Sequence, residues 1–202
     1  RLWAMSDIHA DKKENMQWFQ EDVLILAGDV ANTMEVLQET LLLLKQRFNR
    51  LFFCPGNHDV WMQGWKNGNS LDKLRAIMDF CKSAGIEVEP GFVNTDVGPL
   101  LLVPLVAWHH PQWDTEPDLE EWSVPSPETT MADYWATKWP KDLHIADGSV
   151  AKELDRLNDQ GFAAAMKRRD EVRGIISFSH FLPKMELNPE KRYLIPSSLA
   201  KA

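Results

Sequence analysis

The sequence predicts an α/β fold that opens with a largely parallel sheet. Three short apolar runs, at residues 2–5, 23–27 and 51–54, are each followed by polar or glycine-containing residues, as is typical of buried strands. Amphipathic segments of helical period separate these runs. Strands that alternate with helices favour parallel pairing, because each helix carries the chain back to the start of the next strand.

Two helices are predicted between and after these strands. Residues 33–48 place apolar side chains at helical spacing, at Leu37, Leu41, Leu44 and Phe48. Residues 70–84 repeat the pattern. Ser70 is a suitable N-cap for this second helix, and Gly85 is a suitable residue to end it.

The second part of the chain continues the pattern after an interruption. Residues 86–89 and 100–107 are predicted strands, residues 149–169 a helix and residues 174–179 a further buried strand. Between them, residues 108–146 are rich in Trp, Pro and acidic residues and show little periodicity.

A loop of this length inside a compact domain is usually functional. We therefore expect one domain over residues 1–202, with a cap-like insertion at about residues 108–146.

Composition excludes several classes of protein. The 202 residues are 44% hydrophobic and 26% charged, as in a soluble globular protein, and no apolar run approaches the roughly 20 residues that span a bilayer. A formal net charge of −8 argues against general nucleic-acid binding, which needs a basic surface. It does not argue against a phosphate substrate, because divalent cations in a pocket can reverse the local field.

Two cysteines, Cys54 and Cys81, are too few for a disulfide framework. We expect both thiols to be reduced and buried. Such thiols favour an intracellular compartment, and we expect the cytoplasm or a plastid.

Four polar motifs follow predicted strands directly. They supply Asp7 and His9, then Asp29 after Gly28, then Asn57, His58 and Asp59 after Gly56, and finally His180. The carboxyl ends of neighbouring parallel strands meet in one crevice, so these side chains are expected to converge. Carboxylate, imidazole and amide groups together suit manganese, iron or zinc. A shared aspartate would hold two such ions about 3.5–4 Å apart, the separation used for in-line attack at phosphorus.

The order DxH, GD, GNHD and a strand-borne His is similar to that of the calcineurin-like metallophosphoesterases, and it runs from Asp7 to His180. The resemblance implies two mixed sheets flanked by helices, and a site with two divalent metal ions. It also implies a role for each matching residue. Asp7 and His9 would bind one metal, Asp29 would bridge both, and Asn57 and His180 would bind the second. His58 would donate a proton to the leaving oxygen or stabilise the transition state, and Asp59 would orient its ring. Asn32 stands near a position where some relatives carry Asp, and we assign it no role.

One part of the family pattern is absent. Family members end the site with GHxH or separate later histidines, whereas no histidine follows His180 here. We expect the printed sequence to be part of a longer protein, cut before this motif. The alternative is that the protein has lost two ligands.

The resemblance implies hydrolysis of a phosphate ester by a hydroxide that bridges two metal ions, on a small phosphorylated substrate. Monoester and diester substrates remain equally open. The alternative is a catalytically impaired relative that serves as a binding or scaffold subunit. His109 and His110 follow a predicted strand, and the sequence leaves open whether they line the substrate pocket or form a structural pair.

Overall fold

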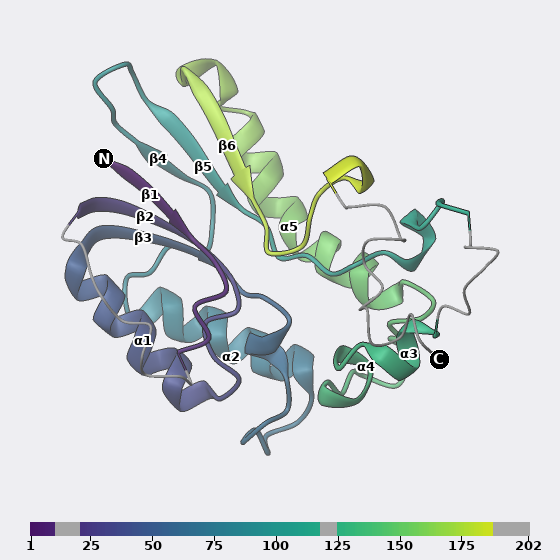
Figure 1. The fold of residues 1–202 in the computed structure, drawn as a ribbon. Coiled ribbons are helices and arrows are strands. Elements are labelled where there is room, and N and C mark those ends of the chain that lie inside the picture. The colour runs from purple at the N-terminus through teal and green to yellow at the C-terminus, as the bar shows by residue number, and fades with distance from the viewer. Residues whose placement is uncertain (11–20, 118–124, 188–202) are drawn as a thin grey trace, which may run out of the picture.

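A computed structural model describes residues 1–10, 21–117 and 125–187. Two three-stranded sheets lie face to face, and helices cover their outer faces (Figure 1). The layers are therefore helix, sheet, sheet and helix, which is the sandwich that the family resemblance implies.

The first sheet is parallel and has the order β1-β2-β3. Its strands are β1 (Leu2–Met5), β2 (Glu21–Ala27) and β3 (Phe48–Cys54). The helices α1 (Met34–Arg47) and α2 (Ser70–Ser83) lie together on one face of this sheet. The predicted parallel start of the fold is thus confirmed, and all three strands end at the same edge.

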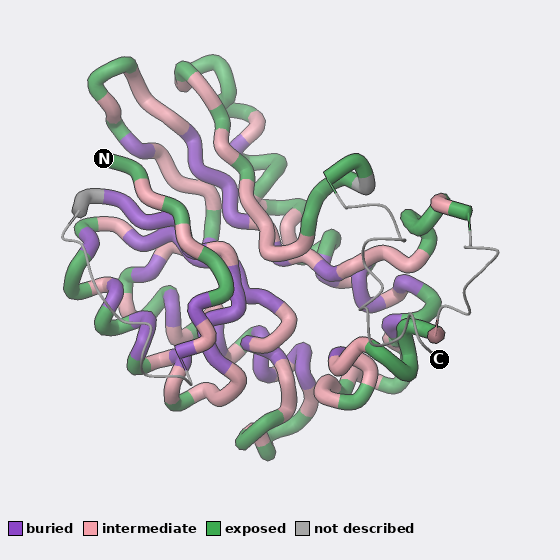
Figure 2. Tube along the Cα trace, in the orientation of Figure 1, coloured by how far each residue is buried: buried purple, intermediate pink, exposed green. Residues whose placement is uncertain are grey.

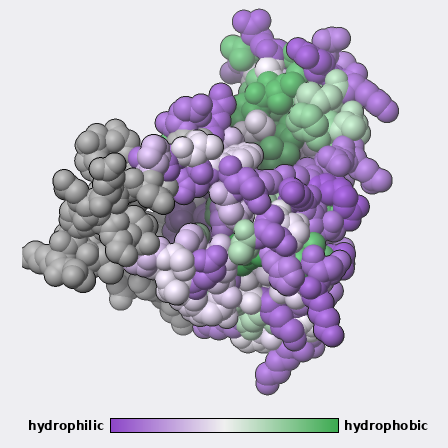
Figure 3. All heavy atoms as spheres, turned by 90° about the vertical axis from the view of Figure 1, so that its right-hand side faces the viewer, coloured by the Kyte–Doolittle hydropathy of each residue, from purple (hydrophilic) through white to green (hydrophobic). Residues whose placement is uncertain are grey.

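The second sheet is mixed and has the order β4-β5-β6. Strand β4 (Gly91–Val93) pairs antiparallel with β5 (Leu100–Pro104), which pairs parallel with β6 (Gly174–Phe178). Helix α5 (Ser149–Met166) packs on this sheet. Figure 3 shows hydrophobic side chains gathered on the surface where β6 and α5 lie.

The prediction of a strand at residues 86–89 is wrong. Ile86 and Val88 are buried, at 2% and 6% exposed, but the only pairing described for this stretch is one isolated bridge between Phe52 and Glu87. Pro90 follows and has no N–H to donate to a ladder. The apolar residues here reflect burial of a connection, and the strand begins only at Gly91.

The start of α2 differs from the prediction, whereas its end agrees with it. Asn69, not Ser70, caps the helix: its side chain accepts the N–H groups of Leu71 and Asp72, at 2.9 and 3.1 Å. Gly85 follows the helix with a φ of 68°, as predicted.

Alternation along the strands divides the core between the layers. In β2, Leu24 and Leu26 face the helices, whereas Val23 and Ile25 face the second sheet. Phe52 of β3 also belongs to the inter-sheet core. Figure 2 shows buried residues concentrated in β2, β3 and the facing sides of α1 and α2. This packing fixes the register of the strands that carry the polar motifs.

The Trp-rich segment contains only short elements where the structure describes it. These are η3 (Pro111–Trp113), α3 (Pro127–Thr130) and α4 (Asp133–Ala136). Trp108 is 3% exposed and packs edge to face against Trp139, with ring centroids 5.2 Å apart. Part of the segment therefore packs into the main core. Three further 3₁₀ turns lie elsewhere in the described residues: η2 (His58–Val60), η4 (Arg169–Glu171) and η5 (Met185–Leu187).

Both cysteines are free and buried, as predicted. Burial raises the pKa of Cys54 and of Cys81 to about 12, so neither thiol ionises near neutral pH. In the part of the chain that the structure describes, no helix has the length and apolar character needed to cross a membrane.

Candidate metal centre

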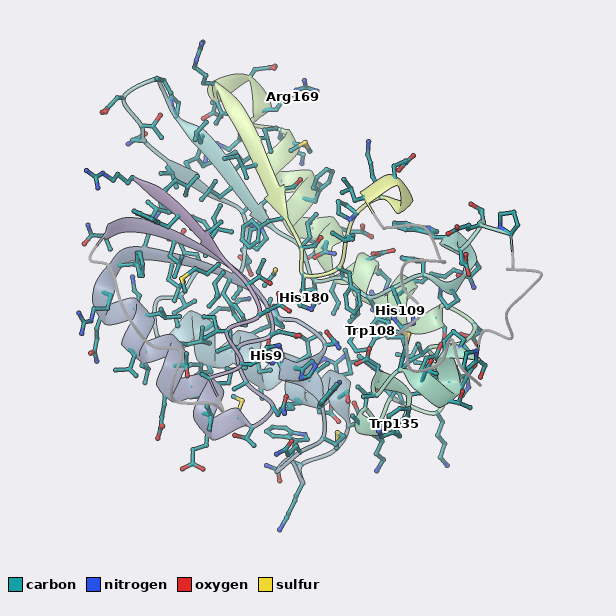
Figure 4. All side chains as sticks on the ribbon, viewed as in Figure 1. His9, Trp108, His109, Trp135, Arg169 and His180 are labelled. Carbon is teal, nitrogen blue, oxygen red and sulfur yellow. The ribbon has the colours of Figure 1, made fainter. Side chains whose placement is uncertain are left out.

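The four predicted motifs meet at one edge of the sandwich. Asp7 and His9 follow β1, Asp29 follows β2, Asn57 and His58 follow β3, and His180 follows β6. His9 and His180 come from different sheets, yet each has a ring nitrogen within 4.0 Å of the Asp29 carboxylate (Figure 4). The convergence expected from the strand order is therefore observed.

Three of these residues have a left-handed backbone. Asp7, His9 and Asp29 have φ values of 53°, 44° and 53°, and they are the non-glycine residues with positive φ among those described. Such a conformation is uncommon outside glycine, although Asp and His tolerate it better than most residues. Backbone hydrogen bonds from Asp7 N to Gly28 O and from His9 N to Asp29 O, at 3.2 and 3.1 Å, hold the two loops together. Backbone strain is thus concentrated at predicted ligands, as often occurs at functional sites.

Two glycines allow the loops to approach closely. A Cβ atom on Gly28 would lie 2.6 Å from Gly56 N and 2.9 Å from His180 Cβ. A Cβ atom on Gly56 would lie 2.2 Å from Asp29 Oδ1. All three distances are too short for a contact with carbon, so any side chain at either position would force the loops apart.

Asp29 lies at the centre of the group. Its side chain is 5% exposed, and three imidazoles surround it: His180 Nε2 is 3.4 Å from Oδ1, and the Nε2 atoms of His58 and His9 are 3.9 and 4.0 Å from Oδ2. The His58 N–H also donates to Oδ1 at 3.0 Å. Burial raises the pKa of Asp29, while the charges of His180 and His58 oppose that rise.

His180 lies between Asn57 and Asp29. The His180 Nδ1 lies 2.9 Å from the carbonyl oxygen of Ala27, which can only accept, so Nδ1–H donates and Nε2 is the ring nitrogen directed into the site. The Asn57 Oδ1 lies 3.0 Å from that Nε2. A donor contact from the second ring nitrogen to a backbone carbonyl is the usual arrangement of a metal-binding histidine, because it fixes the ring orientation.

The ligand atoms form two overlapping groups. His9, Asp29 and His58 make one, and Asp7, Asp29 and His180 make the other, with the atoms of each group within 4.8 Å of one another. Asp29 belongs to both. Oxygen and imidazole donors in these groups fit divalent manganese, iron or zinc, as predicted from the sequence.

His58 is held from two sides. Its Nδ1 lies 2.8 Å from Asn32 Oδ1, and its ring stacks on Trp61 with centroids 3.6 Å apart. Burial lowers the pKa of His58, although the charge of Asp29 opposes this shift. With Nδ1 committed to Asn32, the Nε2 atom is the one directed toward Asp29.

The expectation that Asp59 orients the His58 ring is wrong. The Asp59 carboxylate is fully buried and accepts the backbone N–H groups of Val30, Ala31 and Gly56, at 2.8, 3.0 and 2.9 Å. Burial raises its pKa to about 6, and these N–H donors limit the rise. Asp59 thus ties the loop after β2 to the loop after β3, and Asn32 is the residue that contacts Nδ1 of the His58 ring.

Lys73 supports this arrangement from α2. The side chain is fully buried, and its Nζ donates to the carbonyl oxygens of Asn32 and Trp61, at 2.8 and 2.6 Å. These two residues are the ones that hold the His58 ring. Sequence reasoning missed Lys73, because a lysine in an amphipathic helix normally faces solvent.

Asp133 is the second residue that sequence reasoning missed. It lies on α4 in the Trp-rich segment and is 3% exposed. Its Oδ1 accepts from Asn57 Nδ2 at 2.8 Å and from Trp61 Nε1 at 2.7 Å. Because the Asn57 amide nitrogen is bound to Asp133, the amide oxygen must face His180 and the site. The Trp-rich segment therefore fixes the orientation of a predicted ligand.

Replacing Asp133 by Ala should weaken metal binding about tenfold to a hundredfold, as is usual for the partner of a ligand. The change leaves two partly buried donors, on Asn57 and Trp61, without this acceptor, and the Asn57 amide becomes free to turn. Calorimetric titration with Mn²⁺ measures the effect. Asp133→Asn retains an acceptor oxygen and should lose much less affinity; equal losses in both variants would contradict the orienting role.

His109 and His110 both line a cavity that His180 also lines, so they are not remote from the site. Burial lowers the pKa of His109, which packs among Trp108, Tyr134 and Phe181. The His110 Nε2 lies 2.9 Å from Asp155 Oδ2.

The fold and the converging motifs define a calcineurin-like phosphoesterase. The model of the calcineurin-like phosphoesterase family matches residues 1–104, half of the chain, and the chain belongs to this family. The resemblance given by the motifs is thereby confirmed.

One curated relative is the [acyl-carrier-protein] phosphodiesterase PptH of Mycobacterium tuberculosis (strain ATCC 25618 / H37Rv). It is 37% identical to this chain over 116 residues, which cover 52% of this chain and 36% of that protein. The matched segment thus spans about a third of the relative's length.

The crystal structure of phosphopantetheinyl hydrolase (PptH) from Mycobacterium tuberculosis shares the fold. The superposition has a TM-score of 0.64 at 20% sequence identity and covers 90% of this chain and 68% of that chain. This likeness confirms the predicted class of fold, the sandwich of two sheets flanked by helices.

Proposed function

We propose that this protein hydrolyses a phosphate ester with two divalent cations bound around Asp29. The observation that carries the proposal is that the buried Asp29 carboxylate lies within 4.0 Å of ring nitrogens of both His9 and His180, which belong to different groups of possible ligand atoms. Asp7, His9, Asn57 and His180 complete the set of proposed ligands. When bound, such ions supply positive charge to the phosphate and lower the pKa of water, which yields the nucleophile.

The chain's own residues perform the remaining tasks. Asp29 keeps the two groups of ligands at a fixed separation, because its backbone is held by the loop after β1 and its carboxylate by the His58 N–H. His58 directs Nε2 into the site while Asn32 fixes Nδ1, so His58 is the proposed proton donor to the leaving oxygen. Asp59 acts by holding the loops in place.

We further propose that residues 108–146 are an insertion within a single domain and cover one side of the site. Asp133 supports this role, since it lies in the insertion and binds Asn57. The name of the PptH relative favours a phosphodiester over a phosphomonoester as substrate.

Turnover by full-length protein tests the proposal. Bis(p-nitrophenyl) phosphate should be cleaved in the presence of Mn²⁺, and p-nitrophenyl phosphate more slowly. Removal of metal with a chelator should abolish cleavage, and Mn²⁺ should restore it, because bound metal ions are what lower the pKa of water in the proposed mechanism. Metal binding without turnover of either ester would instead favour the alternative, a binding or scaffold subunit.

A further inference from the structure

A cavity of about 250 Å³ opens beside the proposed metal ligands. His180 belongs to both places: its Nε2 lies 3.4 Å from Asp29 Oδ1, and its side chain also lines the cavity. Figure 4 shows Trp108 and His109 on the side of His180 away from His9. A phosphate held at Asp29 would therefore have its ester substituent next to this cavity.

The walls of the cavity are mostly rings. His110 stacks on Trp113 with centroids 4.7 Å apart and planes 11° apart. Trp108 and His180 each contact Phe181, with centroids 5.4 Å apart in both pairs. These rings come from two segments, one after β5 and one after β6.

Part of this wall presents apolar surface to solvent. Trp113 is 46% exposed and Leu182 is 50% exposed, on the two segments that form the cavity. The Trp113 ring is nevertheless held in place, because the Asp155 carboxylate binds His110 Nε2 at 2.9 Å and His110 stacks on Trp113. A fixed, exposed ring is suited to stack on a flat ligand with little loss of conformational entropy.

The positive charge of Lys184 restricts which ester substituents the cavity can bind. Lys184 lines the same cavity, and no residue in the described part of the chain forms an ion pair with it. Its ammonium disfavours a cationic substituent and favours a neutral or anionic one.

We propose that this cavity binds an aromatic substituent of the phosphate ester and so selects aryl or similarly flat esters over alkyl esters. This inference rests on the proposed function, since it needs the phosphate to lie at Asp29. The volume is below the roughly 300 Å³ at which pockets for drug-sized ligands begin, so it suits one ring system. A larger cavity, of about 600 Å³, lies among α2, β5 and α5, and its walls contain none of the proposed ligands.

Binding of two non-hydrolysable phosphonates tests the inference without requiring turnover. In full-length protein with Mn²⁺, calorimetry should show phenylphosphonate binding about tenfold or more tightly than methylphosphonate, because only the phenyl group fills the cavity. Trp113→Ala should remove most of this preference by weakening phenylphosphonate alone. Trp135→Ala is the matched control: Trp135 is 62% exposed and does not line the cavity, so both affinities should stay unchanged.

Failures of the two proposals look different. Cleavage of phosphate esters together with equal affinities for the two phosphonates would overturn the aromatic cavity and leave the proposed function standing. A preference for phenylphosphonate that survives in Trp113→Ala would also overturn it. If neither phosphonate binds and no ester is cleaved, both proposals are overturned.

Discussion

Replacing Asp29 by Asn is expected to lower the turnover of a phosphate ester at least about a thousandfold, equivalent to about 4 kcal/mol of transition-state stabilisation. The amide keeps the shape of the carboxylate but loses the charge that both groups of ligand atoms share. The loss should therefore exceed that of changing a ligand that belongs to one group only. Initial rates at saturating Mn²⁺ measure it, because a mere loss of affinity would be corrected by added metal.

The same variant should lose activity without losing stability when both proteins are free of metal. Burial opposes the charged form of Asp29, so metal-free Asp29→Asn should melt at the same temperature as the metal-free wild type or higher. Adding Mn²⁺ should raise the melting temperature of the wild type and not that of the variant, since only a ligand bound to the native state stabilises it. Asp142→Asn makes the same chemical change at an exposed position and should behave as wild type throughout. A variant at Asp29 with wild-type turnover would contradict the mechanism.

Replacing Gly56 by Ala is the second change with a large expected effect. The new Cβ atom would lie 2.2 Å from Asp29 Oδ1 and 2.6 Å from Asp29 N, so the backbone and side chain of Asp29 must move. We expect destabilisation by about 1–3 kcal/mol, as for other overpacked sites, and loss of at least about a hundredfold in turnover because the shared ligand is displaced. Chemical denaturation and initial rates measure the two effects separately.

Gly174→Ala is the matched control for this substitution. A Cβ atom there would meet only the side-chain atom Leu100 Cδ2, at 3.4 Å, which is close to an ordinary contact. Stability and turnover should stay near the wild-type values. Normal turnover in Gly56→Ala would contradict the close approach of the loops after β2 and β3.

The sequence was sufficient to predict the residues that converge. Asp7, Asp29 and His180 each follow an apolar strand, and parallel strands end at one edge of a sheet, so local pattern and topology together determine where these side chains lie. The same reasoning predicted the first three strands and their pairing. It failed at residues 86–89, where the apolar residues are buried but form no strand pairing beyond one isolated bridge.

The sequence was not sufficient for the residues that orient the ligands. Asp133 is one of many acidic residues in a segment without periodicity, and only the folded chain brings it to Asn57. Lys73 lies on a helix where periodicity alone predicts that its side chain is exposed. It can be buried because two backbone carbonyl groups accept hydrogen bonds from its Nζ. The contact of Asn32 with His58 likewise depends on how two loops meet, which no local pattern encodes.

The most direct test of the central claim is the number of Mn²⁺ ions bound per chain of full-length protein, measured by calorimetric titration of the metal-free form. Two ions should bind to the wild type, and binding of both should be strongly weakened in Asp29→Asn, because the Asp29 carboxylate belongs to both groups of ligand atoms. Two ions bound with unchanged affinity in Asp29→Asn, or no ion bound by the wild type, would contradict this claim.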